Sequence, residues 1–211
     1  MSTRVGPRQG LETAVRVEWF TVTWMSVEAI VSIGAGLLAR SLLLTAFGLD
    51  SVIELITGSI LLWRLRVEAR GASPEGVEAA ERRAQLVTVV ALVLLCLYVL
   101  ATAGVDLLGV TRSEGSTIGI LISLAAVVVM PWLAWVKRGL AHGLRSEALR
   151  NDAASSLTCG YMAGAVLVGV ACTTLFDWWW AEGLAAFVFF FWLVQETREA
   201  IEEVRGSRAD D

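Results

Sequence analysis

The chain has 211 residues, 56% of them apolar, with a net charge of −4 and a mean hydropathy of +0.65. The apolar share is higher than in an ordinary soluble domain, and long apolar stretches account for it. No cluster of basic residues resembles a nucleic-acid-binding patch, so no nucleic-acid partner is expected. The composition predicts an all-α polytopic membrane protein that lies in a lipid bilayer.

Few residues of the chain suggest catalysis or a disulfide framework. The three cysteines, Cys96, Cys159 and Cys172, all lie in apolar stretches, which argues against structural disulfides. The single histidine, His142, falls in a predicted loop. There is no nucleophile–histidine pair and no phosphate-binding loop, so the chain is not expected to be an enzyme. We also find no cleavable signal peptide at the N-terminus.

Six apolar stretches each have roughly the length that a bilayer-spanning helix needs. They cover residues 17–38, 42–63, 86–108, 116–136, 148–173 and 178–194. They divide the chain into an N-terminal segment (1–16), a transmembrane domain (17–197) and a short tail (198–211).

The basic residues predict the orientation of these six helices. All but two of the 17 lysines and arginines lie before the first helix, after the sixth, or in the two links on the same side. Only Arg40 and Arg112 fall on the other side, and Lys137 is counted here with the link that precedes the fifth helix. By the positive-inside rule, both termini are expected in the cytoplasm.

The second predicted helix carries two acids in an otherwise apolar run. Asp50 and Glu54 are four residues apart, so they share one helix face. They bracket the middle of the segment between Arg40 and Arg64. An acid at that depth is costly and indicates a functional site by default. The alternative is a pair of acids that is held protonated or bound to a neighbouring helix.

The fifth predicted helix carries polar groups at the matching positions. When SLLLTAFGLDSVIE is set beside SEALRNDAASSLTC, Asp50 falls on Ser155 and Glu54 on Cys159. The two helices are antiparallel, so Asp50 is expected at the depth of Cys159, and Glu54 at the depth of Ser155. Asp152 shares the same face, one turn nearer the cytoplasm.

Two carboxylates and a thiolate can together bind a divalent metal ion. Zinc accepts both Cys sulfur and Asp or Glu oxygen in tetrahedral geometry, and the thiolate favours zinc over magnesium or calcium. We therefore expect Asp50, Glu54 and Cys159 to bind the ion, with Asp152 or Ser155 completing its coordination. The thiol and carboxyl groups must lose protons to bind the metal, which provides a basis for metal–proton exchange. The alternative for Cys159 is a buried small hydrophobic residue.

Other groups in the predicted spans are more ambiguous. Glu28, near the middle of the first helix, is a candidate fourth ligand, a proton carrier or a partner of a neighbouring polar group. No lysine or arginine is predicted inside the spans to neutralise the acids, so a bound cation is the simplest partner for them. Gly160 and Gly164 would let a neighbouring helix approach the fifth helix closely. The tryptophans at 178–180 suit an aromatic belt at the membrane interface.

These features resemble the cation diffusion facilitator (cation efflux) family, in a short form without its cytoplasmic C-terminal domain. Asp50 and Glu54 match its second-helix motif. The stretch SEALRNDAASSLTCGY is similar to the family pattern S-x-A-L-x-A-D-x-x-H-x-x-x-D through four residues, Ser146, Ala148, Leu149 and Asp152. The family's His and Asp positions fall on Ser155 and Cys159. The resemblance covers residues 17 to 197.

The resemblance implies a homodimer in the plasma membrane that exports Zn²⁺ or a similar divalent cation in exchange for protons. Transport would proceed by alternating access around a mid-membrane site on the second and fifth helices. No cofactor is expected besides the transported ion. The alternative, favoured by Ser155, is a non-transporting scaffold or regulatory subunit that kept the fold with a degenerate metal site. A redox role for Cys159 lacks a second cysteine at CxxC spacing.

Overall fold

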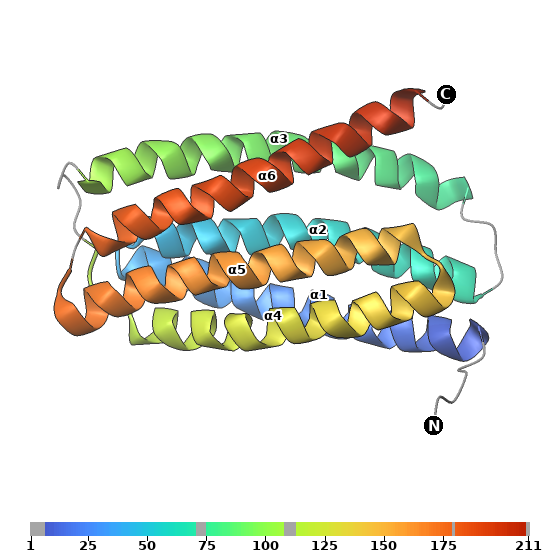
Figure 1. The fold of residues 1–211 in the computed structure, drawn as a ribbon, viewed down its shortest axis with the longest axis horizontal. Helices are drawn as coiled ribbons and strands as arrows, with labels where there is room; N and C mark the ends of the chain where they lie inside the picture. The colour runs from blue at the N-terminus through green and yellow to red at the C-terminus, as the bar shows by residue number, and fades with distance from the viewer. Residues whose placement is uncertain (1–6, 71–74, 108–112, 179, 210–211) are drawn as a thin grey trace.

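The computed structural model describes residues 7–70, 75–107, 113–178 and 180–209 (Figure 1). These ranges form six helices, so the predicted all-α fold is confirmed. The helices are α1 (Pro7–Leu38), α2 (Leu42–Ala69), α3 (Glu75–Leu107), α4 (Thr117–Leu144), α5 (Glu147–Phe176) and α6 (Ala181–Ala209). Arg112 and Trp179, which figure in the predictions above, lie outside the described residues, as do the two chain ends.

The helices extend further than the apolar stretches predict. α1 begins at Pro7 instead of residue 17, α4 continues to Leu144, and α6 continues to Ala209 instead of ending at residue 194. The helices continue past the predicted spans because an apolar stretch marks the membrane, whereas Glu, Ala, Lys and Arg propagate a helix well into water. Functional side chains can therefore lie on helix beyond the apolar run.

The six helices form an antiparallel bundle around a central pair. Contacts follow the ring order α1, α2, α3, α6, α5, α4, and α2 also touches α5 across the middle. In Figure 1, α3 and α6 lie together along one side of the bundle, and α1 and α4 lie along the opposite side. The helices α2 and α5 lie between these two pairs. The first residue of α1 and the last residue of α6 lie at the same end of the bundle, which we call the terminal end; the opposite end is the far end.

Serine residues fix where three of the helices begin. Ser41, Ser116 and Ser146 each precede a helix in extended conformation, and each side-chain oxygen accepts a hydrogen bond from the backbone N–H three residues on. Such a cap is worth about 1 kcal/mol. Ser41 and Ser146 begin the two helices that carry the candidate metal ligands, so these caps set the register of those ligands.

Glycines on α5 allow α4 to approach closely. A β-carbon on Gly160 would lie 3.0 Å from the ring carbons Cδ and Cγ of Pro131, within α4, and one on Gly164 would lie 4.0 Å from Val127. The predicted close contact on this glycine face is therefore confirmed, and its partner is α4. The proline ring takes the space that a side chain at 160 would need.

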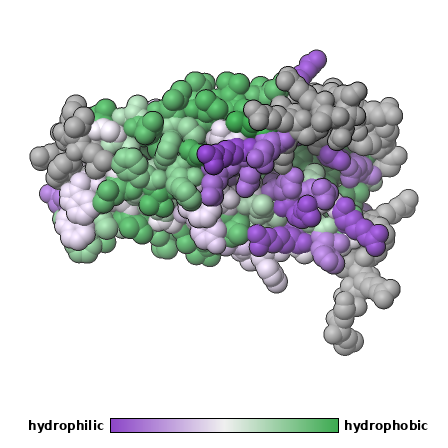
Figure 2. All heavy atoms as spheres, turned by 45° about the horizontal axis from the view of Figure 1, so that its top comes forward, coloured by the Kyte–Doolittle hydropathy of each residue, from purple (hydrophilic) through white to green (hydrophobic). Residues whose placement is uncertain are grey.

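The surface of the bundle suits a lipid environment. Five of the helices, α1 to α5, are long and apolar enough to cross a membrane. α6, whose apolar run contains Glu182 and is followed by Glu196, is not among these five. Large apolar side chains are exposed, with Ile30 74% and Trp135 72% accessible. Figure 2 shows hydrophobic side chains over the far-end part and hydrophilic ones gathered toward the terminal end. The chain is a polytopic membrane bundle.

Candidate metal centre

Three potential metal ligands from α2 and α5 converge inside the bundle. Asp50, Glu54 and Cys159 each offer one ligand atom, and these atoms all lie within 4.8 Å of one another. We call this group the acid–thiol triad. At 1.5 Å per residue, Asp50 and Glu54 lie about 12 and 18 Å along α2 from its start at Leu42. Both positions fall well inside a hydrocarbon core about 30 Å thick.

The Asp50 carboxylate has no hydrogen-bond partner in the described part of the chain. The side chain is 0% exposed, and both of its oxygens lack a hydrogen-bond partner among the described residues. Leaving a buried polar group unsatisfied is costly, and far more so when it is charged. The carboxylate nevertheless faces Glu54 and Cys159, an arrangement that a bound cation would stabilise.

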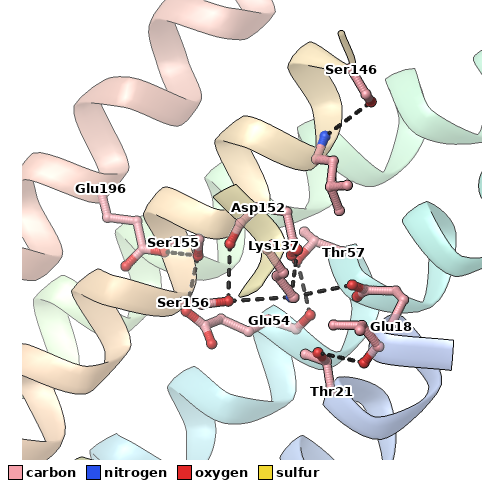
Figure 3. Close-up of polar contacts among 12 residues, drawn as sticks. Glu18, Thr21, Glu54, Thr57, Lys137, Ser146, Asp152, Ser155, Ser156 and Glu196 are labelled. Atoms are coloured by element: carbon pink, nitrogen blue, oxygen red, sulfur yellow. Dashed lines mark hydrogen bonds and ion pairs between the residues drawn. The ribbon is translucent and has the colours of Figure 1, made fainter. Parts of the chain in front are cut away.

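Ser155 links the triad to α6. Its hydroxyl donates to Glu54 Oε1 at 3.0 Å, which confirms the predicted pairing in depth. The same hydroxyl oxygen lies 3.3 Å from Glu196 Oε1, as Figure 3 shows. Glu196 therefore lies beside the site, and it is not among the residues predicted from the sequence.

A sequence signal for Glu196 did exist. Its position is seven residues after Phe189 and three after Leu193, and both of these residues are fully buried. Residues at such intervals share one helix face, so Glu196 continues the buried face of α6. The predicted sixth helix ends at residue 194, so Glu196 falls beyond that helix, although it lies within the predicted transmembrane domain (17–197).

Glu28 lies against the triad with both of its oxygens occupied. The indole N–H of Trp24 donates to Oε2 at 2.7 Å, and the Ser51 hydroxyl donates to Oε1 at 2.8 Å. The Cys159 thiol also lies 3.8 Å from Oε1 and donates to it. Among the roles left open for Glu28, this geometry favours a hydrogen-bond partner that orients Cys159.

Asp152 is held by a buried lysine. Lys137 Nζ lies 2.5 Å from Asp152 Oδ2 and 3.2 Å from Glu18 Oε2, and it donates to Ser156 Oγ at 3.3 Å. Figure 3 shows these groups converging from α1, α4 and α5. We call them the lysine cluster. The structure therefore does not bring Asp152 into the acid–thiol triad.

The expectation that no lysine or arginine lies in the spans is wrong at this cluster. Lys137 is 0% exposed and belongs to α4, not to the link before α5. At 1.5 Å per residue it lies about 30 Å along α4 from Thr117, at the edge of the hydrocarbon core. Because the apolar run ends just before Lys137, the sequence by itself predicts a loop at this residue.

A cavity of about 720 Å³ leads from the triad toward the terminal end. Glu54, Ser155 and Glu196 line its deep part, and Arg64 and Glu202 lie among its residues nearer that end. Carboxylates in a cleft with low-dielectric walls raise the local concentration of cations. The cavity therefore gives ions a path to the triad from the terminal end.

The far end is closed by direct contacts among α2, α5 and α6. The hydroxyl of Ser41, the residue that caps α2, donates to Glu182 Oε2 at 2.5 Å, and both side chains are buried. A β-carbon on Gly169 would lie only 2.8 Å from Cβ of Ala185. Packing this close leaves no room for a hydrated ion between these helices.

Comparison with known proteins agrees with this architecture. Residues 20–206 match the family described as the cation efflux transmembrane domain. A search of curated proteins found no match. The matched region contains the whole acid–thiol triad, Glu196 and the lysine cluster except Glu18, which lies just before it. Members of such a family move cations across membranes, and this match covers most of the chain: the protein belongs to the cation efflux family.

Proposed function

We propose that this protein exports a divalent metal cation, with Zn²⁺ as its preferred substrate, by proton-coupled antiport through the acid–thiol triad. The observation that carries the proposal is the Asp50 carboxylate. It is fully buried, without a hydrogen-bond partner among the described residues, and grouped with Glu54 and Cys159. A buried acid of this kind marks an ion pathway in membrane proteins.

The donor set supports zinc as the substrate. Asp50 and Glu54 supply oxygen and Cys159 supplies sulfur, a combination that zinc accepts in tetrahedral geometry. Magnesium and calcium prefer oxygen alone. A water molecule, or a neighbouring oxygen such as Ser155 Oγ, would complete four-coordination.

The surroundings of Cys159 support proton coupling. A thiol must lose its proton to bind zinc, and so must any protonated carboxyl group. The Cys159 thiol donates to Glu28 Oε1 at 3.8 Å, so Glu28 is the acceptor within reach. Metal binding would then release protons within the protein, and metal release would take them up again.

The cavity at the terminal end and the closed far end support alternating access, with this structure open toward the termini. The basic residues argue that the terminal end faces the cytoplasm, so the triad would load from the cytoplasm and release outside. We place the protein in the plasma membrane. The homodimer implied by the family resemblance remains part of the proposal.

Calorimetry with the purified protein tests the site. We expect wild-type protein to bind one Zn²⁺, and Asp50→Ala and Cys159→Ser each to weaken binding by at least about tenfold, the loss seen even for groups that only support a ligand. Cys172→Ser is the matched control, because Cys172 lies outside the triad. Absence of Zn²⁺ binding to the wild type would contradict the proposal and favour a non-transporting scaffold.

Flux measurements in proteoliposomes test the coupling. In proton antiport, each Zn²⁺ that enters the lumen is exchanged for protons that leave it at a fixed ratio. The luminal pH therefore rises as Zn²⁺ accumulates, and a pH-sensitive dye reports this rise. Zinc flux without a coupled pH change would show uniport instead. Asp50→Ala should abolish both signals together.

A further inference from the structure

A single hydroxyl lies between two carboxylates on the cavity side of the triad. Ser155 Oγ is 3.0 Å from Glu54 Oε1 and 3.3 Å from Glu196 Oε1. A serine hydroxyl carries one proton, so it donates to only one of these oxygens at a time. The other oxygen of Glu196, Oε2, is buried and has no hydrogen-bond partner among the described residues. The arrangement thus has more acceptors than donors.

This group of oxygens lies next to the acid–thiol triad but is distinct from it. Glu54 belongs to both groups, whereas Glu196 is not among the residues whose ligand atoms lie within 4.8 Å of one another. Glu54, Ser155 and Glu196 all line the cavity that leads to the terminal end. An ion that enters through the cavity therefore meets them beside Asp50 and Cys159, which do not line it.

We propose that Glu54, Ser155 and Glu196 form an upstream position, which holds a divalent cation before it moves to the acid–thiol triad. The inference rests on the proposed function and adds a binding site from α6 to it. A cation bound there would provide the positive charge that these oxygens need, because the single hydroxyl proton cannot satisfy all of them. Glu54 can remain bound to the ion while Glu196 is exchanged for Asp50 and Cys159.

The chemistry of the two positions differs. The upstream position offers two carboxylates and a hydroxyl, all oxygen donors, which suit hard cations such as Mn²⁺ and Mg²⁺ as well as Zn²⁺. The triad adds the thiolate of Cys159, which selects softer ions. The upstream position would therefore capture divalent cations in general, and the transfer to Cys159 would decide which of them proceeds.

Binding of Mn²⁺, followed by electron paramagnetic resonance, tests the upstream position separately from the triad. Full-length Asp50→Ala protein should retain one Mn²⁺ site of weakened affinity. Adding Glu196→Gln should weaken that site by at least about tenfold, the scale seen for groups around a metal. The matched control, Glu199→Gln, changes an exposed residue on the same helix that also lines the cavity, and it should change affinity by less than about threefold.

Two results would overturn the upstream position. One is an Asp50→Ala protein that binds no Mn²⁺, and the other is a Glu196→Gln change that leaves Mn²⁺ affinity as it was. Either can occur while wild-type protein still binds and transports Zn²⁺, so the proposed function would stand.

Zinc measurements on otherwise wild-type protein separate a capture role from direct coordination in the triad. Glu196→Gln should keep equilibrium Zn²⁺ affinity within about threefold but lower the initial transport rate at limiting Zn²⁺ by at least about tenfold. Loss of Zn²⁺ affinity by the same factor would instead make Glu196 a ligand of the triad, and two separate positions would then be excluded.

Discussion

At the scale of single residues, the bundle treats its buried acids in two ways. Glu18 and Asp152 share the ammonium group of Lys137, which lies 3.2 and 2.5 Å from their oxygens. Asp50, which is as fully buried as Glu18, has no hydrogen-bond partner among the described residues. A buried charge is tolerated when it is paired. The acids of the lysine cluster are therefore paired with a cation of the protein itself, whereas Asp50 has no such ion pair among the described residues, as the proposed metal site requires.

This difference predicts the effect of removing the lysine. Lys137→Met leaves Glu18 and Asp152 without their cation, and breaking a buried pair typically costs about 3–5 kcal/mol of stability. We expect a clear drop in the melting temperature of the protein in detergent. The triple variant Glu18→Gln/Lys137→Met/Asp152→Asn removes the charges as well and should recover much of the loss. Equal melting temperatures for Lys137→Met and wild type would show that the pair contributes no stability.

At the scale of helices, glycine contacts decide how closely α2 lies against α1. A β-carbon on Gly48 would lie 2.8 Å from the backbone nitrogen of Ile33 and 2.6 Å from its Cγ1. Backbone cannot move aside as a flexible side chain can, so only glycine fits here. Gly48 lies two residues before Asp50, and this contact therefore fixes the depth of Asp50 in the bundle.

Alanine substitutions test this helix contact. Gly48→Ala should destabilise the protein by about 1–3 kcal/mol, the usual cost of overpacking, and should weaken Zn²⁺ binding by displacing Asp50. Gly34→Ala is the matched control within α1, because no atom lies within 4 Å of its added β-carbon. There the better helix propensity of alanine should stabilise by up to about 1 kcal/mol. Thermal melts of both variants in the same detergent measure the two effects.

At the scale of the whole molecule, the two ends of the bundle differ. The terminal end contains the cavity that reaches Glu54 and Ser155. At the far end, Ser41 and Glu182 join α2 to α6, and Gly169 brings α5 against Ala185. The acid–thiol triad is therefore reached from one side only in this conformation, which matches one of the two states of the proposed alternating-access cycle.

Thiol labelling from each side of the membrane tests this asymmetry. In protein whose three native cysteines are replaced by serine, Thr57→Cys places a thiol on the cavity wall at an exposed position. We expect a membrane-impermeant maleimide to modify it from the side of the termini. Glu114→Cys, in the exposed link before α4, is the matched control and should react only from the opposite side. Reaction of both thiols from the same side would contradict the topology.

Sequence alone determined the membrane class, the number of helices and the face of α2 that carries Asp50 and Glu54. These features depend on apolar length and on helical periodicity, which are local properties of the chain. The same local reasoning predicted that Glu54 lies at the depth of Ser155. Two antiparallel helices of known length that span the same membrane can be aligned in only one register.

Only the tertiary structure decided which acids remain open to a cation. Lys137 follows an apolar stretch and reads as a loop residue, yet it is buried between Glu18 and Asp152 because α4 continues beyond the apolar run. Glu196 likewise follows the apolar part of α6 and reaches Ser155 across a helix contact. Contacts between residues so distant in sequence depend on how the helices pack against one another, and no local pattern records that packing.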